Sequence, residues 1–518
     1  MYCPDFWYGF DSTQQMEKVL LSYRTEFEKS LSDPISFWRE QAHRVAWSTT
    51  PETILGKDAN GNDVWFPDGE LNSSYLALDH HVEAGRGENT ALIYDSPVTG
   101  VLQKYTFNEL RNEVARFAGV LTSLGVTKGD RVIIYLPMIP EAAISMLSCA
   151  RIGAIHSVVF GGFAARELAT RIDDARPKVL LTASCGIEFS NVIEYKPLVD
   201  EAMSLAQHQI EHCVVYQREQ CQARMGDKDL DWQECMAAAE PVDWIPVKSC
   251  DPLYILYTSG TTGKPKGVVR DNGGHATALL YSMAAIYDVG PGEVYWAASD
   301  VGWVVGHSYI VYAPLFAGCT TILFEGKPVR TPDAGTFWRV ISDHKVNVFF
   351  TAPTAFRAIR KEDPSSQLLG QYDLSSLKTL FVAGERTDPS TYHWLCDILK
   401  IPVVDHWWQT ESGWPIAGNP MGIEPHECKA GSACLPVPGH DIQILSPEHH
   451  RLDANEEGDV VIKLPLPPGW LPTVWGDHQR YTDAYLVHHD GYYLTGDGGY
   501  FDEDGYLFIM GRTDDVIN

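Results

Sequence analysis

Residues 257–267, YTSGTTGKPKG, combine glycines, hydroxyl side chains and lysines in one short segment. Glycines let a backbone turn sharply and bring its N–H groups close to an anion. Lys264 and Lys266 add positive charge beside them. The apolar run before the segment, residues 253–256, predicts a short buried strand that leads into it. This composition favours a binding loop for a polyphosphate.

The segment does not follow the P-loop pattern, which has four residues between its glycines and a hydroxyl side chain after its lysine. Here two residues separate Gly260 from Gly263, and Pro265 follows Lys264. A surface turn rich in glycine, serine and threonine is the simplest alternative. Such a turn needs neither the lysines nor the run of hydroxyls, so we favour a phosphate loop of another kind.

The segment resembles the phosphate loop of adenylate-forming acyl-CoA synthetases, and further motifs narrow the resemblance to short-chain enzymes of the acetyl- and propionyl-CoA synthetase type. These motifs follow in the family's order at residues 299–309 (SDVGWVVGHSY), 324–326 (FEG), 351–355 (TAPTA), 405–411 (DHWWQTE) and 511–516 (GRTDDV). The resemblance covers nearly the whole chain. It implies an α/β fold, with two αβ subdomains of mostly parallel sheets and a small β-barrel subdomain.

The resemblance also implies a reaction. ATP would activate a short-chain carboxylic acid to acyl-AMP, and coenzyme A would then take the acyl group, so that pyrophosphate and AMP are released. Because the first step brings two anions together, it needs charge neutralisation and positioning more than a general base. ATP, Mg²⁺ and coenzyme A (as a substrate) are the expected small molecules. His307 is for that reason interpreted as structural and not as a base.

The resemblance assigns residues to each part of this chemistry. Thr410, Glu411 and Lys266 are the predicted catalytic residues, with the Thr410 hydroxyl toward the α-phosphate and the Glu411 carboxylate toward the metal. The predicted ATP phosphate ligands are Thr258, Ser259, Gly260, Thr261, Thr262, Gly263 and Lys264. The predicted adenine and ribose contacts are Gly384, Glu385, Arg386, Asp405, His406, Trp407, Gln409, Asp497 and Arg512. A carboxylate such as Asp497 can accept both hydrogen bonds of a ribose diol.

The acyl pocket is expected at Val304, Val305, Ala383 and Trp408, with Trp408 closing its far end against long chains. Acetate-specific relatives carry a valine where this chain has Ala383. The smaller side chain leaves room for one more methylene, worth about 0.8 kcal/mol when buried. Arg386 and His406 also resemble the propionyl branch. We therefore expect a preference for propionate over acetate, with butyrate tolerated weakly.

Coenzyme A is expected against Phe160, Gly161, Gly162 and Val305. One departure from the family concerns its 3′-phosphate. Where acetyl-CoA synthetases carry two arginines, this chain has Glu188 and Asn191, and a carboxylate would repel the phosphate. Lys196 and Arg166 are the alternatives that the sequence offers, besides looser binding.

Alternating strand-like and helical segments from about residue 105 to 250 predict a parallel sheet covered by helices. Residues 131–135, 156–160 and 179–182 are typical of strands, and 141–151 and 165–174 of helices. Asp33 is expected to cap a helix that begins at Pro34. The expected divisions are an N-terminal segment at 1–85, αβ subdomains at 86–267 and 268–415, a β-barrel at 416–513 and a hinge at 514–518. The resemblance places a mobile C-terminal domain after that hinge, and we expect poor turnover without it.

The formal net charge of −28 argues against a nucleic-acid-binding face, which would need a basic surface. The N-terminus lacks the pattern of a secretory signal, and no apolar run is long enough to span a membrane. The eleven cysteines, an odd number without a Cys-x-x-Cys pair, favour free thiols in a cytoplasmic or organellar interior. Three alternatives stay open: an acetate-preferring synthetase, an adenylation module that loads a carrier thiol, and an inactive nucleotide-binding scaffold. The oligomeric state stays open too.

Overall fold

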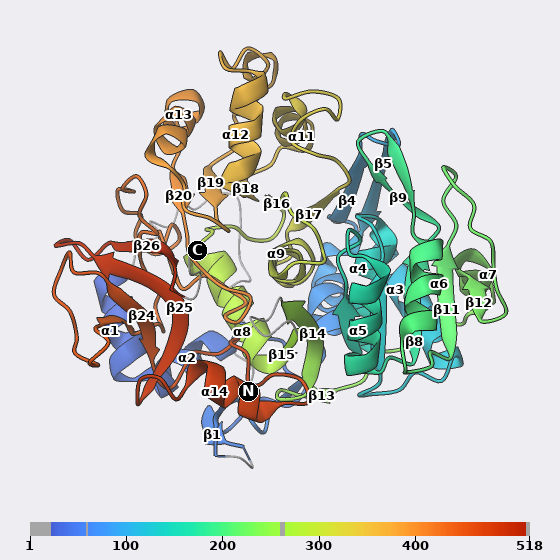
Figure 1. The fold of residues 1–518 in the computed structure, drawn as a ribbon, viewed down its shortest axis with the longest axis horizontal. Helices are drawn as coiled ribbons and strands as arrows, with labels where there is room; N and C mark the ends of the chain where they lie inside the picture. Colours follow the sequence, from blue (N-terminus) through green and yellow to red (C-terminus); the bar gives the residue numbers. More distant parts are fainter. Residues whose placement is uncertain (1–21, 59–60, 259–264, 514–518) are drawn as a thin grey trace.

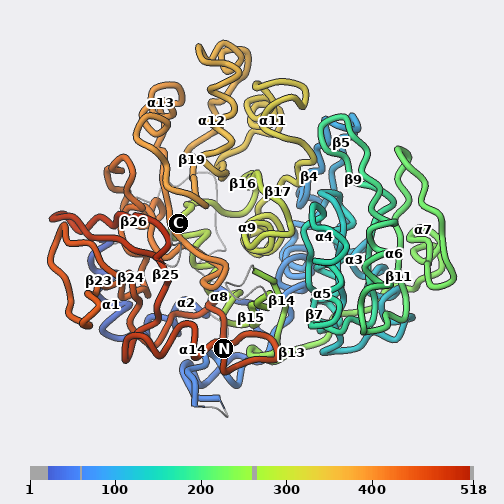
Figure 2. The backbone as a smooth tube through the Cα atoms, viewed as in Figure 1, coloured from blue at the N-terminus to red at the C-terminus, as the bar shows by residue number. Residues whose placement is uncertain are grey.

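The computed structural model describes residues 22–58, 61–258 and 265–513. Its first two helices are α1 (Tyr23–Ser32) and α2 (Pro34–Ala42), and the Asp33 side chain accepts a hydrogen bond of 3.1 Å from the Ser36 amide. The predicted cap by Asp33 and the predicted helix start at Pro34 are therefore confirmed. These helices lie beside the C-terminal part of the chain in Figures 1 and 2. The Tyr23 hydroxyl joins the two parts by donating to the Pro436 carbonyl at 2.8 Å.

The first large sheet has seven strands. Their order is β12 (Asp229–Asp231), β11 (His212–Tyr216), β8 (Val179–Ala183), β6 (Arg131–Tyr135), β7 (Ile155–Val158), β14 (Pro252–Thr258) and β15 (Lys266–Asp271). All pairs are parallel except β14 with β15.

Helices cover both faces of this sheet, as the strand–helix alternation predicts. They are α3 (Phe107–Ser123), α4 (Pro140–Arg151), α5 (Ala165–Ala175), α6 (Lys196–Leu205) and α7 (Trp232–Ala238). Along β6, Val132 and Ile134 pack into the core that contains α3 and α4, whereas Ile133 and Tyr135 pack with α5 and α6. Successive side chains of a strand point to opposite faces, so an apolar run fits a sheet buried on both sides.

The second large sheet also has seven strands. Their order is β20 (Val403–Asp405), β19 (Thr379–Val382), β18 (Val348–Thr351), β16 (Val294–Ala297), β17 (Thr320–Phe324), β4 (Thr90–Ser96) and β5 (Val101–Thr106). Its larger helices are α8 (Gly273–Ala285), α11 (Thr336–His344), α12 (Pro353–Glu362) and α13 (Pro389–Leu399). The antiparallel β4–β5 hairpin joins this sheet through β17, although both strands fall inside the range 86–267 expected for the first subdomain. The expected boundary at 86 therefore places β4 and β5 with the first sheet, whereas they pair with the second. The local sequence pattern cannot reveal this pairing, because β17 is far away in the chain.

The C-terminal region forms a four-stranded antiparallel sheet. Its strands are β23 (Ile442–Leu445), β24 (Gly458–Lys463), β25 (Tyr492–Phe501) and β26 (Leu507–Arg512), paired in that order. The pairing is linear within the described residues, so this region is an open sheet where a small barrel was expected. Helix α14 (His478–Tyr485) stands between β24 and β25 in the chain. The β25–β26 ladder places Asp497 opposite Arg512.

Shorter elements complete the fold. They are β1 (Leu55–Lys57), β2 (Asp63–Trp65), β3 (Glu70–Leu71), β9 (Cys185–Glu188), β10 (Asn191–Glu194), β13 (Val247–Lys248), β21 (Ala417–Gly418), β22 (Leu435–Pro436), α9 (Val304–Gly306), α10 (Ala313–Phe316), π-helical turns at Tyr75–Asp79, Val82–Arg86 and His307–Tyr312, and a 3₁₀ turn at Leu369–Gln371. Within the described ranges, the structure contains no helix with the length and apolar character required to cross a bilayer.

Candidate active site

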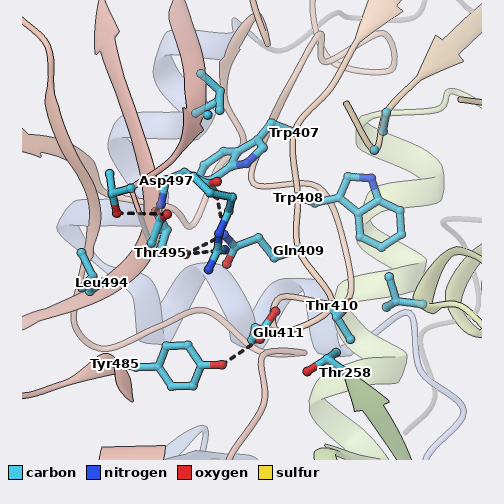
Figure 3. Close-up of a pocket in the computed structure, with 18 of the residues that line it drawn as sticks. Thr258, Trp407, Trp408, Gln409, Thr410, Glu411, Tyr485, Leu494, Thr495 and Asp497 are labelled. Carbon is cyan, nitrogen blue, oxygen red and sulfur yellow. Dashed lines mark hydrogen bonds between the residues drawn. The ribbon is translucent and has the colours of Figure 1, made fainter. Parts of the chain in front are cut away.

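A cleft of about 1600 Å³ lies where the loops after β19 and β20 meet the C-terminal sheet and α14. It is lined by every described residue that the sequence assigns to catalysis, nucleotide binding or the acyl pocket. These are Thr258, Lys266, Val304, Val305, Ala383, Gly384, Glu385, Arg386, Asp405, His406, Trp407, Trp408, Gln409, Thr410, Glu411, Asp497 and Arg512. Figure 3 shows the run from Trp407 to Glu411 along this cleft, facing residues of β25 and α14.

Three side chains from distant parts of the chain meet at one carboxylate. Lys266 Nζ lies 2.7 Å from Glu411 Oε1, and the Tyr485 hydroxyl donates to the same oxygen at 2.7 Å (Figure 3). Lys266 and Tyr485 are also hydrogen-bonded to each other. Burial alone would raise the pKa of Glu411, but the Lys266 ammonium and the hydrogen bonds hold it below its usual value. Glu411 is therefore an ionised carboxylate at the cleft wall.

The turn that carries Thr410 and Glu411 is anchored from behind by Arg270. This fully buried arginine donates to the carbonyls of Thr410, Glu411 and Ser412, with 2.9 Å to that of Glu411 and 3.2 Å to that of Ser412. Gly413 makes room for it, because a Cβ there would lie 2.7 Å from the guanidinium carbon. A guanidinium fork that satisfies several buried carbonyls fixes a loop more firmly than a single donor can.

At another wall of the cleft, Gln409 is hydrogen-bonded to β25. Its amide donates to the Thr495 carbonyl at 2.8 Å and to Asp497 Oδ2 at 2.5 Å, while Arg512 donates to the same carbonyl at 3.3 Å. Burial raises the pKa of Asp497 to about 6, against the opposing effect of Arg512. This carboxylate therefore titrates within two pH units of neutrality.

The predicted adenine wall contains residues with different roles. Gly384 adopts φ 98°, a conformation that favours glycine, and begins the turn after β19. The Glu385 carboxylate forms an ion pair with Arg357, with 2.5 Å between Oε2 and Nη2, and accepts a hydrogen bond from the Thr354 hydroxyl. Asp405 accepts the Thr387 amide at 3.0 Å, and burial raises its pKa to about 7.

The His406 ring belongs to the core. Nδ1 lies 2.8 Å from the Val382 carbonyl and Nε2 lies 2.9 Å from the Tyr287 hydroxyl. Burial lowers the pKa of His406 to about 4, so the ring is neutral. Both ring nitrogens are engaged in the core, so His406 lines the cleft without offering a free ring nitrogen to it.

The residues predicted to hold the acyl group form an apolar end of the cleft. Ala383 is 6% exposed and belongs to the main hydrophobic core, against which Val304, Val305 and Trp408 pack. The Trp408 ring meets Tyr309 edge-on at 5.4 Å between centroids. Edge-to-face packing of this kind fixes a large side chain in position. His307, on the following turn, is buried with Nδ1 3.0 Å from the Trp303 carbonyl, and burial lowers its pKa to about 4.

The structure describes only the two ends of the predicted phosphate loop. Ser259, Gly260, Thr261, Thr262, Gly263 and Lys264 lie outside the described residues. Of the described residues at its two ends, Thr258 and Lys266 both line the cleft. The Thr258 hydroxyl is buried and has no hydrogen-bond partner within the described part of the chain. An unsatisfied buried hydroxyl in a cleft suits an incoming phosphate oxygen, because buried polar groups are normally paired.

The donor set also fits Mg²⁺. This ion usually takes one or two protein carboxylates and completes its shell with substrate phosphates and water. Glu411 supplies one ionised carboxylate, and no group of three or more His, Cys, Asp or Glu side chains is arranged for a metal within residues 22–58, 61–258 and 265–513. An ion held here would depend mainly on the nucleotide's own oxygens.

Of the predicted coenzyme A residues, Val305 lines the cleft, whereas Phe160, Gly161 and Gly162 lie outside its lining. The Phe160 ring lies 5.3 Å from that of Trp303, which lines the cleft and is 47% exposed. Gly161 faces Tyr195, whose hydroxyl oxygen would lie 2.1 Å from an added Cβ. Lys196 is buried and bound to Asp229 at 2.8 Å and to Asp200, so it is not the exposed cation considered from the sequence.

Tyr485 and Arg270 belong to none of the motifs recognised in the sequence. Tyr485 reaches the site from α14, and Arg270 reaches it from β15. The one available signal was the apolar pair Val268 and Val269 directly before Arg270, because an arginine in a buried strand requires buried acceptors.

Residues 78–466 match the family model of AMP-binding enzymes, and residues 23–77 match that of the acetyl-coenzyme A synthetase N-terminus. An uncharacterised protein of Pseudomonas aeruginosa is 61% identical over 96% of this chain and 80% of its own length. Human mitochondrial acyl-CoA synthetase short-chain family member 3 is 50% identical over 96% of this chain and 73% of its own length.

One further relative and one solved structure are also acyl-CoA-forming enzymes by their names. Propionate–CoA ligase of Escherichia coli is 44% identical over 96% of this chain and 80% of its own length. The structure of acetoacetyl-CoA synthetase from Streptomyces lividans matches with a TM-score of 0.87 and 27% identity, over 95% of this chain and 75% of that one. The chain therefore belongs to the short-chain acyl-CoA synthetases of the AMP-binding family, acid–CoA ligases that use ATP, Mg²⁺ and coenzyme A.

Proposed function

We propose that this acid–CoA ligase prefers propionate to acetate. The observation that carries the proposal is Ala383, a small side chain at the apolar end of the cleft, in the core to which Trp408 packs. Its size leaves room for a second carbon on the acid, while Trp408 limits further length. The relative named propionate–CoA ligase supports the same preference.

The site residues take proposed roles in the adenylation step. Asp497 and Gln409 would hold the ribose, Trp407 and the 384–386 turn would flank adenine, and the apolar end would fix the acid's carbon chain. Glu411 and the substrate phosphates would hold Mg²⁺, which neutralises phosphate charge. Lys266 would balance negative charge around the α-phosphate, and the Thr410 hydroxyl would donate a hydrogen bond to it. The acid's carboxylate then attacks the α-phosphorus and pyrophosphate leaves, with positioning supplying most of the rate.

The family assignment favours transfer to coenzyme A over the carrier-loading module and the inactive scaffold considered from the sequence. The thiol would approach past Phe160 and Trp303. All ten cysteines of the described residues are free, which supports a reducing compartment, either cytoplasm or organellar matrix.

The preference can be tested with non-hydrolysable acyl-adenylate analogues, the acetyl, propionyl and butyryl sulfamoyl adenosines, titrated calorimetrically into this chain. One methylene buried in the pocket predicts propionyl binding about fourfold tighter than acetyl. We expect the butyryl analogue to bind more weakly than the propionyl one. An acetyl analogue that binds as tightly as the propionyl one would contradict the preference, while leaving the ligase assignment untouched.

A further inference from the structure

Tyr485, the last residue of α14, occupies an unassigned place between the two charged groups of the site. Its hydroxyl is hydrogen-bonded to both Glu411 and Lys266, and Lys266 Nζ lies 4.7 Å above the centre of its ring. The ring stacks on Tyr493, with centroids 4.8 Å apart and planes inclined by 12°. The Tyr485 side chain is therefore held by stacking of its ring and by hydrogen bonds of its hydroxyl.

The helix that carries Tyr485 is itself tied to the segment that carries Lys266. Asp477 caps its N-terminus by accepting the Arg480 amide at 3.0 Å, and the Arg480 guanidinium donates to the Pro265 carbonyl at 3.0 Å. Helix α14 thus bonds to the backbone next to Lys266 and, one turn later, to the Lys266–Glu411 pair. Helix α14 is therefore tied both to the segment that carries Lys266 and to Glu411.

Lys266 and Tyr485 both bond to Oε1 of Glu411, but they differ in charge. Lys266 carries an ammonium group, whereas the phenol of Tyr485 is a neutral hydroxyl that donates to the carboxylate at neutral pH. A metal cation and the Lys266 ammonium would repel each other if both stayed within 3 Å of one oxygen. A neutral hydroxyl can share the carboxylate with a cation without that repulsion.

We infer that Tyr485 is the positioning residue that keeps the Glu411 carboxylate aimed into the cleft when Lys266 leaves it for the phosphates. The inference rests on the proposed metal-binding role of Glu411. It explains why two donors converge on one oxygen: Lys266 neutralises the buried carboxylate before nucleotide binds, and Tyr485 holds its orientation afterwards. Because both hydrogen bonds to Tyr485 arise from its hydroxyl, the role belongs to that atom and not to the ring.

The test measures how much Mg²⁺ strengthens ATP binding, by calorimetry with Mg²⁺ and with EDTA in its place. Tyr485→Phe keeps the ring and its stacking but removes the donor. Because a hydrogen bond to a charged group is lost, we expect the Mg²⁺ enhancement of ATP affinity to fall by about 10- to 100-fold, with ATP affinity in EDTA little changed. Tyr481→Phe is the matched control, since Tyr481 is a buried tyrosine one turn earlier on α14 that does not line the cleft. It should leave both affinities unchanged.

A second variant, at Lys266, tests whether Lys266 and Tyr485 have separate roles. Its result does not depend on whether Tyr485→Phe folds. Lys266→Met should weaken ATP binding with and without Mg²⁺ alike, and should retain the enhancement because Tyr485 still orients Glu411. Loss of the enhancement in Lys266→Met, an unchanged enhancement in Tyr485→Phe, or an equal loss in both conditions would each overturn the inference about Tyr485. Absence of any enhancement in the unmodified protein would instead overturn the metal-binding role of Glu411.

Discussion

The two ends of the cleft are positioned by different forces. At the end that we propose for the nucleotide, called the nucleotide end, Lys266, Glu411 and Tyr485 come from β15, the loop after β20 and α14, and meet through hydrogen bonds and one ion pair. At the end that we propose for the acid, called the acyl end, Ala383 packs in the main hydrophobic core and Trp408 packs against it. Charge and hydrogen-bond geometry position the side chains of the nucleotide end, whereas the volume of the side chains determines the space at the acyl end.

The two ends should therefore respond differently to substitution. Removing a charge from the nucleotide end leaves a partner unsatisfied in a half-buried place, where electrostatic interactions are strong. Changing a side chain at the acyl end adds or removes space, worth about 0.8 kcal/mol per methylene. Substitutions at the nucleotide end should therefore change the rate, and those at the acyl end should change the choice of acid.

The largest effect is expected for Glu411→Gln, which keeps the shape of the side chain and removes its charge. Adenylate formation should fall by about 100-fold or more, as when one preorganised electrostatic group is lost from an active site. Pyrophosphate exchange into ATP with propionate as the acid measures it. Glu503→Gln, at an exposed carboxylate, is the control. A loss below tenfold would show that Glu411 is not the charge that the reaction needs.

Local patterns predicted much of this arrangement. The strand at residues 131–135 and the helix start at Pro34 were predicted correctly, because strand composition and helix caps depend on residues that are neighbours in the sequence. The motif at 405–411 was likewise readable, and the structure places its residues along the cleft; their individual roles stay predictions.

What the sequence could not show depends on pairing between distant segments. Joining β4 to the second sheet requires knowledge of β17, and the role of Tyr485 depends on a contact with Glu411 from another subdomain. His406 shows the same limit within one motif. Its position in the purine wall was predicted, but the direction of its ring is set by Val382 and Tyr287 in the core behind.

The next largest effect is expected at the opposite end, for Trp408→Gly. Opening the closed end of the pocket should let longer acids enter, so that the hexanoyl analogue gains at least about 50-fold in affinity relative to the propionyl one, from three further buried methylenes. Trp408→Phe, which keeps a ring in place, should retain the exclusion. Calorimetry with both sulfamoyl adenosines would check it, and an unchanged ratio in the glycine variant would place the acyl end elsewhere.

A smaller effect, of about tenfold, is expected from pH. Burial raises the pKa of Asp497 to about 6, so at pH 5 only about a tenth of the carboxyls are ionised and able to accept both ribose hydroxyls. Adenosine affinity should rise about tenfold from pH 5 to 7 and then level off. Because burial also raises the pKa of Asp405, to about 7, Asp497→Asn is needed to separate the two; its affinity should lose most of this dependence.

The same shift has a consequence for stability with the opposite sign. A folded-state pKa of about 6, above the usual value of 3.8, means that the folded protein holds this proton more tightly than the unfolded chain does. The contribution of Asp497 to stability is therefore full below about pH 4 and is lost as the pH rises through 6. Asp497→Asn should gain in denaturant midpoint relative to the unmodified protein at pH 8, and not at pH 4. A gain of equal size at both pH values would contradict the raised pKa.

The smallest effect tests the acyl end most directly, because Ala383→Val alters volume alone. The added methyl groups fill the space that we assign to the second carbon of propionate, so the ratio of propionyl to acetyl affinity should fall by about fourfold or more, one methylene's worth. The affinity for adenosine, and the Mg²⁺ enhancement of ATP binding, should stay as they are, since no hydrogen bond of the nucleotide end involves the Ala383 side chain. A changed Mg²⁺ enhancement in this variant would mean that packing and charge are coupled across the cleft, and that the two ends do not act separately.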